Sequence, residues 1–199
     1  MGKILIIGPG RSGSTFLVQL LTRLGFDTGF QPYNEPYGEN TRAGCEWRVE
    51  LDLNAPHDQW REQLNNMPRI LKAPEWSLVL KHFVKERLVE VDHVFIPLRD
   101  LDIAAKSRLD VGLDWHVEPT DDYNYKLMDQ ASVHALAFGR AVEACEICDL
   151  PYTIMHFPRF VENKPYCYWS LMNALSINWR MFEKVFDELA KPEKIKWRE

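Results

Sequence analysis

The sequence has no long hydrophobic run, no excess of basic residues and few cysteines, and each absence excludes a class of protein. No apolar run approaches the roughly 20 residues that a membrane-spanning helix needs. The apolar segment before Gly8 is too short for the core of a signal peptide, so we expect a cytoplasmic protein. A net charge of −5 argues against non-specific nucleic-acid binding, which requires a basic face.

The cysteines offer little sign of a metal or redox site. Of the four, Cys145 and Cys148 have the spacing of a redox or zinc motif, but no second Cys or His pair stands near them. They fall in a helical pattern that shares an apolar face with Val133, Ala137 and Ala141. We therefore expect small hydrophobic core residues there.

The length of 199 residues predicts a single domain over residues 1–199. Strand-like and helix-like segments alternate, which predicts a three-layer α/β sandwich with a mostly parallel central sheet. The expected strands cover residues 3–7, 47–53, 70–71, 93–98 and 152–156. The expected helices cover residues 13–24, a segment opening at Pro56, and 76–90, 100–109, 130–148, 165–175 and 177–190. Pro97 indicates that its strand ends early or lies where no backbone donor is needed.

The most informative segment is the glycine-rich sequence GPGRSGST, from Gly8 to Thr15. It follows an apolar strand and precedes a helix, an order that presents a nest of backbone N–H groups to a phosphate or sulfate. The spacing G-x-x-x-x-G is that of a P-loop, but Ser14 stands where the P-loop lysine should follow the last glycine. The sequence thus predicts a P-loop-like phosphate site that lacks the lysine of nucleotide triphosphatases.

A second group of polar residues follows other expected strands. Lys72 and Arg99 both stand at strand ends, where ligands bind in parallel sheets. Ser107 lies eight residues after Arg99, in a helix that Asp100 can cap. The planar fork of an arginine matches phosphate oxygens, although a surface ion pair explains Arg99 and Asp100 about as well.

The two segments together resemble the sulfotransferases that use 3′-phosphoadenosine 5′-phosphosulfate (PAPS), above all their carbohydrate and bacterial branches. In that family a P-loop-like segment binds the 5′-phosphosulfate, and a strand-end Arg with a Ser eight positions later binds the 3′-phosphate. The matching segments here are Pro9–Leu17 and Leu98–Arg108. In addition, Tyr33–Pro36 resembles the Glu-Pro segment of those branches, and Leu71–Pro74 resembles their Lys-x-Pro segment.

The resemblance implies an enzyme that moves a sulfuryl group from PAPS to a hydroxyl or amine of a small or carbohydrate-like acceptor. In-line displacement would release adenosine 3′,5′-bisphosphate (PAP), with no metal required. The resemblance assigns the cofactor to Gly10, Arg11, Ser12, Gly13, Ser14, Thr15, Arg99 and Ser107. It assigns the base to Glu35 and the stabilisation of developing charge to Arg11 and Lys72. The Arg-Lys-Gly loop of cytosolic members has no counterpart in the C-terminal half.

Alternatives stay open for both the base and the function. The histidines that are alternatives to Glu35 are His57, His82, His93, His116, His134 and His156. One alternative function is a P-loop nucleotide kinase or phosphotransferase, which the absent lysine disfavours. The other is a non-catalytic nucleotide-binding protein of the same fold.

Overall fold

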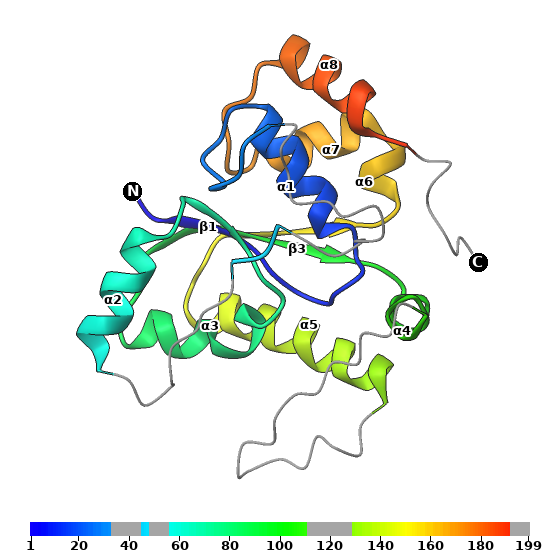
Figure 1. Ribbon diagram of the computed structural model, residues 1–199. Coiled ribbons are helices and arrows are strands. Elements are labelled where there is room, and N and C mark those ends of the chain that lie inside the picture. The colour runs from blue at the N-terminus through cyan, green and yellow to red at the C-terminus, as the bar shows by residue number, and fades with distance from the viewer. Residues whose placement is uncertain (33–44, 48–55, 111–128, 192–199) are drawn as a thin grey trace.

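The computed structural model describes residues 1–32, 45–47, 56–110 and 129–191. Within them, four parallel strands form one sheet in the order β2-β1-β3-β4. These strands are β1 (Lys3–Ile6), β2 (Ile70–Lys72), β3 (Val91–Leu98) and β4 (Tyr152–His156). Helices flank this sheet, which confirms the expected α/β class (Figure 1). The strand expected at 47–53 lies outside the described residues except for its first position.

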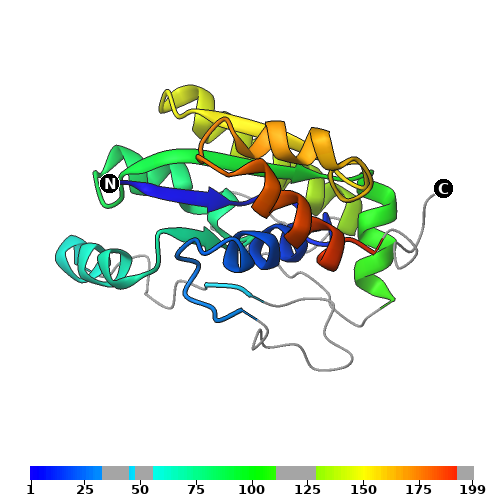
Figure 2. The ribbon, with the colours of Figure 1, turned by 90° about the horizontal axis from the view of Figure 1, so that it is seen from above.

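Helices cover the sheet on both sides (Figure 1). One side carries α1 (Ser14–Arg23), α6 (Arg159–Glu162), α7 (Lys164–Leu171) and α8 (Trp179–Leu189), and the other carries α2 (His57–Asn66), α3 (Trp76–Lys85) and α5 (Gln130–Ile147). The helix α4 (Leu101–Leu109) follows β3 at the carboxyl end of the sheet, and α8 lies alongside α1 (Figure 2). In the described part of the chain, no helix is both long enough and apolar enough to cross a membrane.

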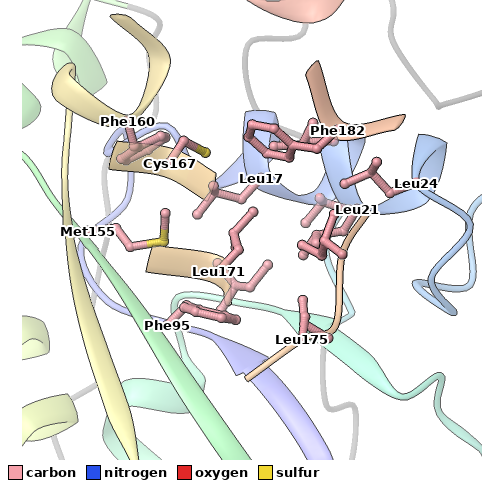
Figure 3. Close-up of a cluster of buried hydrophobic side chains, with 14 of the residues drawn as sticks. Leu17, Leu21, Leu24, Phe95, Met155, Phe160, Cys167, Leu171, Leu175 and Phe182 are labelled. Atoms are coloured by element: carbon pink, nitrogen blue, oxygen red, sulfur yellow. The ribbon is translucent and has the colours of Figure 1, made fainter. Parts of the chain in front are cut away.

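The core divides into two clusters because alternate residues of each strand face opposite sides of the sheet. Ile4 and Ile6 of β1 pack on the α1 side, whereas Leu5 and Ile7 pack on the α3 side. A strand buried on both faces must be apolar throughout, which explains the continuous hydrophobic sequence of β1. Figure 3 shows the α1-side cluster, which includes Leu17, Leu21, Phe95, Met155, Leu171 and Phe182.

Pro97 lies inside β3 at a position where a backbone donor is not needed. The carbonyl of Phe95 accepts the N–H of Ile7 at 3.1 Å. In this part of β3 the backbone N–H and C=O groups of the odd-numbered residues therefore point toward β1. Pro97 also faces that side, but β1 has already ended at Ile6 and the chain turns at Gly8, where φ is 126°. The second of the two expectations for Pro97 is therefore confirmed.

Two helix boundaries differ from expectation. The helix expected at 76–90 ends at Lys85, because the N–H of Leu88 turns back to the carbonyl of Phe83 at 2.8 Å. Arg87 makes this turn with a φ of 54°, and β3 then begins at Val91.

The helix expected at 165–175 is α7, which begins at Lys164 and ends at Leu171, and the short helix α6 before it was not expected. The side chain of Asn163 accepts the N–H of Tyr166 at 2.9 Å, so it starts a new helix before Pro165.

The cysteine expectation is confirmed for Cys145, whose side chain is buried among the α3-side residues. Burial raises the pKa of its thiol to about 12, which makes it unreactive at neutral pH. Cys148 is only partly buried.

Candidate functional site

The carboxyl ends of the parallel strands bring the predicted site segments to one edge of the sheet. The loop 7–13 follows β1, Lys72 ends β2, Arg99 follows β3, and Phe157 follows β4. Within the sheet, β2 lies next to β1 along one lateral edge, and β3, the next strand in the chain, lies next to β1 along its other lateral edge. This reversal between β1 and β3 makes the edge a topological switch point, the usual position of a ligand in an open parallel sheet.

The loop after β1 has the backbone conformation of an anion nest. Gly8, Arg11 and Gly13 have φ values of 126°, 63° and 82°, so residues of positive and negative φ alternate from Gly10 to Gly13. Such alternation turns successive N–H groups toward one concavity. The hydroxyl of Ser12 is buried and donates to the carbonyl of Pro9 at 2.6 Å, so this side chain holds the loop together. What Ser12 can offer a ligand is its backbone N–H.

Gly13 ends the loop and begins α1, and the space around it is full. A Cβ atom there would lie 2.5 Å from Cδ2 of Phe157 and 2.8 Å from Cζ of Phe160. Glycine at this position also leaves α1 without a capping side chain, and the N–H of Phe16 bonds the carbonyl of Gly13 at 3.0 Å. A helix N-terminus of this kind favours an anion through its dipole.

Lys72 brings an ammonium group to the N-terminus of α1. Its Nζ lies 3.5 Å from Oγ1 of Thr15 and 2.7 Å from Oε1 of Glu46, and its side chain is 3% exposed. Beside Lys72 the loop encloses a narrow gap with no room for a water molecule, and its lining includes Gly8, Pro9, Ser12, Ser14, Lys72 and Pro74. The loop has Ser14 where a P-loop has lysine, but Lys72 at the end of β2 brings a cation to the same region.

Glu46 is a site residue that the sequence analysis missed. It lies in an irregular segment that is tied to β2, because the N–H of Trp47 bonds the carbonyl of Lys72 at 2.9 Å. The indole of Trp47 also donates to the carbonyl of Thr28 at 2.9 Å. The one signal in the sequence was its place just before the alternating segment 47–53.

On the other side of the loop, Arg11, Arg99 and Ser107 come together. Nε of Arg11 donates to Oγ of Ser107 at 3.3 Å, and Nη1 of Arg99 donates to the carbonyl of Arg11 at 3.4 Å. Arg99 and Ser107 are both buried, with exposures of 8% and 5%. The guanidinium of Arg99 lies 5.0 Å from the ring centre of Phe157. Arg11 therefore belongs to the Ser107 side of the loop.

The start of α4 fixes this second group. The carboxylate of Asp100 accepts the N–H of Ile103 at 2.9 Å, which confirms the expected cap. Burial lowers the pKa of Arg99, and the neighbouring Asp100 partly offsets this effect. An arginine remains charged under all ordinary conditions, so Arg99 presents a partly desolvated cation.

A further arginine approaches the loop from α4. A Cβ atom on Gly10 would lie 2.7 Å from Nη1 of Arg108, so the missing side chain makes room for this guanidinium. Behind it, His134 of α5 is fully buried. Burial and the charge of Arg108 lower the pKa of His134 to about 4, so its imidazole is neutral at pH 7.

The alternative bases lie in different environments. His93 is buried, bonds the hydroxyl of Thr153 at 2.9 Å, and has its pKa lowered by burial. His57 and His82 are exposed on α2 and α3, whereas His156 is exposed at the carboxyl end of β4. Glu35 and His116 lie outside the described residues.

This edge of the sheet can bind two anionic groups, one on each side of the loop. The first side has the nest, the hydroxyls of Ser14 and Thr15, and Lys72; the second has Arg11, Arg99 and Ser107. No group of three or more His, Cys, Asp or Glu residues suited to a metal ion occurs in the described ranges. The chain matches no protein-family model, and no curated protein matches it in sequence.

Proposed function

We propose that the protein is a sulfotransferase that moves a sulfuryl group from PAPS to a hydroxyl or amine of a small or carbohydrate-like acceptor. The observation that carries the proposal is the presence of two groups of anion-binding side chains on opposite sides of one loop. Arg11 links them, because its backbone lies in the loop and its side chain reaches Ser107. In this proposal the fold is a P-loop-like, three-layer α/β sandwich.

The groups at this edge fit a ligand that carries two separate anions, as PAPS does. We assign the 5′-phosphosulfate to the N–H groups of Gly10–Gly13, the hydroxyls of Ser14 and Thr15, and the ammonium of Lys72. We assign the 3′-phosphate to Arg99, Ser107 and Arg11. Backbone N–H groups at a helix N-terminus favour phosphate, and buried arginine forms strong charge-assisted hydrogen bonds with it.

The reaction needs little from the protein beyond position and charge. The acceptor oxygen or nitrogen bonds to sulfur while the bond from sulfur to the bridging oxygen breaks, and the leaving phosphate keeps that electron pair. The nest and Lys72 would stabilise the charge that develops on the leaving group. Holding donor and acceptor in line supplies most of the remaining acceleration.

The proton of the acceptor requires a base, for which we propose Glu35. Glu35→Gln should abolish sulfuryl transfer and leave the affinity for PAP within about threefold of wild type, because a base contributes mainly to the chemical step. Unchanged transfer would reject Glu35 as the base without rejecting the enzyme class.

A comparison of two nucleotides tests the proposed function against a kinase. PAP should raise the melting temperature by several degrees more than ATP with magnesium at equal concentration, since only a ligand of the native state stabilises it. Arg99→Gln and Ser107→Ala should each reduce the PAP response. Arg69→Gln is the matched control, because Arg69 precedes β2 at the opposite edge and pairs with Asp92 at 3.3 Å. A larger response to magnesium ATP than to PAP would favour a kinase and contradict the proposal.

Transfer itself is measured with PAPS that carries labelled sulfur and a panel of hydroxylated, amino and carbohydrate acceptors. A labelled acceptor product that depends on Lys72 would support the enzyme. Tight binding of PAP with no labelled product across the panel would instead favour a non-catalytic nucleotide-binding protein.

A further inference from the structure

The ion pair between Lys72 and Glu46 is set into the candidate anion site. Nζ of Lys72 lies 2.7 Å from Oε1 of Glu46, and the two side chains are only 3% and 20% exposed. The pair is much more buried than Arg69–Asp92, where both side chains are at least 34% exposed. The desolvation of a pair this buried offsets much of its attraction, but losing one partner is costly because the other charge stays buried.

The ammonium of Lys72 also lies close to the N-terminus of α1, where the proposed anion would bind. It is 3.5 Å from Oγ1 of Thr15 in the first turn of α1 and lines the narrow gap beside the nest. An anion bound at that helix N-terminus would attract Lys72. The carboxylate of Glu46, which is held on the same ammonium, would repel that anion.

We propose that Glu46 holds Lys72 in the ligand-free site and that a bound anion takes Lys72 over from it. The proposal rests on the proposed function, because the anion in question is the phosphosulfate or phosphate assigned to the nest. Glu46 is a positioning residue in this scheme and acts through Lys72. It supplies a counter-charge for the buried lysine until the ligand provides another.

The exchange has opposite effects on the empty and the liganded protein. Without the charge of Glu46, the empty protein keeps a buried cation that has lost a carboxylate partner, so it loses stability. The anion then meets less competition for Lys72 and less repulsion, so it binds more tightly. A Glu46 that merely supports the fold, or that aims Lys72 at the ligand, would instead weaken binding when neutralised.

Calorimetric titration of PAP into the full-length chain at fixed ionic strength shows whether neutralising Glu46 strengthens or weakens binding. Glu46→Gln should lower the melting temperature of the free protein and bind PAP about tenfold more tightly than wild type. Glu46→Asp retains the charge and should stay within about threefold of wild type. Lys72→Met should weaken binding about tenfold or more, because the ligand loses the cation that it would take over.

Glu143→Gln is the matched control for the loss of one carboxylate. Glu143 pairs with Lys81 at 2.6 Å on α5, away from the loop, so its neutralisation should leave the affinity for PAP unchanged. Weaker binding by Glu46→Gln, or no effect of Lys72→Met, would overturn the exchange.

A structure of wild-type protein with PAP tests the exchange even if Glu46→Gln fails to fold. We expect Nζ of Lys72 to contact a phosphate oxygen and to lie more than 4 Å from the carboxylate of Glu46. A bound phosphate with the ion pair intact would overturn the inference while supporting the proposed function. No binding of PAP by wild type would overturn both.

Discussion

Gly13 shows how strongly a single residue is constrained where the loop meets α1. Its φ of 82° is a conformation that other residues adopt at a cost, and its missing side chain leaves room for Phe157 and Phe160. Two other glycines allow the effect of the positive φ to be distinguished from the effect of close packing. Gly25 has a φ of 87° with open space around it, whereas Gly139 lies in α5 with open space and no such φ.

Alanine substitutions at these three glycines should therefore rank in a fixed order. Gly13→Ala should lower the free energy of unfolding by about 3 kcal/mol, from strain and overpacking together. Gly25→Ala should cost about 1 kcal/mol from strain alone. Gly139→Ala should stabilise the protein by up to about 1 kcal/mol, because alanine favours the helix. Urea unfolding measures all three, and equal costs at Gly13 and Gly25 would contradict the packing of the loop on Phe157.

Two residues mark the limit of what the sequence predicts at this scale. The glycine spacing predicted the loop, but a φ of 63° at Arg11 has no local signal, since arginine carries no preference for that conformation. The contact of Arg11 with Ser107 joins residues 96 apart and depends on the packing of α4 beside the loop. Glu46 likewise meets Lys72 only because the segment at Trp47 pairs with β2.

Helix α8 packs on the side of α1 that faces away from the sheet. Phe16 of α1 packs edge to face on Phe186 of α8 with ring centres 5.7 Å apart. Phe182 is fully buried in the same cluster (Figure 3). Its neighbour Met181 is 47% exposed. The helix that presents the nest is thus held between the sheet and a C-terminal helix.

Truncation of adjacent residues on α8 tests this packing. Phe182→Ala should lower the free energy of unfolding by about 4 kcal/mol, because it leaves a cavity between α1, α7 and α8. Met181→Ala should change it by less than about 0.5 kcal/mol, since exposed positions lose little on truncation. Denaturant titration gives both values, and a cost below 1 kcal/mol for Phe182→Ala would show that α8 does not pack as described.

The elements that the sequence predicted well are those with a regular apolar pattern. The strands β1 and β4 and the helices α1, α5 and α8 begin and end within about two residues of expectation. The end of α3 was placed too late because Arg87 reverses the chain without a glycine. The short helix α6 was missed because four residues are too few to show a helical pattern in the sequence.

For the whole molecule, alternation of strands and helices predicted an α/β sheet but not its strand order. The strand order β2-β1-β3-β4 depends on how the connecting helices pack on the sheet. No local sequence pattern predicts that packing. Strand order nevertheless places the switch point, and with it the site, beside β1.

The stability of the whole chain should depend on pH through His134. Its pKa is about 4 in the folded protein against 6.5 for an exposed histidine, so the unfolded chain binds a proton more readily between these values. The free energy of unfolding should therefore be unaffected above pH 6.5 and fall as the pH drops toward 4, by at most about 3 kcal/mol from this residue.

Unfolding in urea across that pH range measures the effect. His134→Leu cannot take up the proton, so its stability should decline less steeply than that of wild type. His82→Leu, at an exposed histidine on α3, should follow the wild-type profile. Parallel profiles for His134→Leu and wild type would exclude His134 as a source of acid sensitivity.

In the proposed function, one edge of the sheet binds two separate phosphates of the same nucleotide. Calorimetric titration with PAP and with adenosine 5′-monophosphate tests it most directly, because the two ligands differ only in the 3′-phosphate. Wild type should bind PAP about 10- to 100-fold more tightly, and Arg99→Gln should remove most of that preference while Arg69→Gln keeps it. Equal affinity of wild type for the two nucleotides would contradict the account.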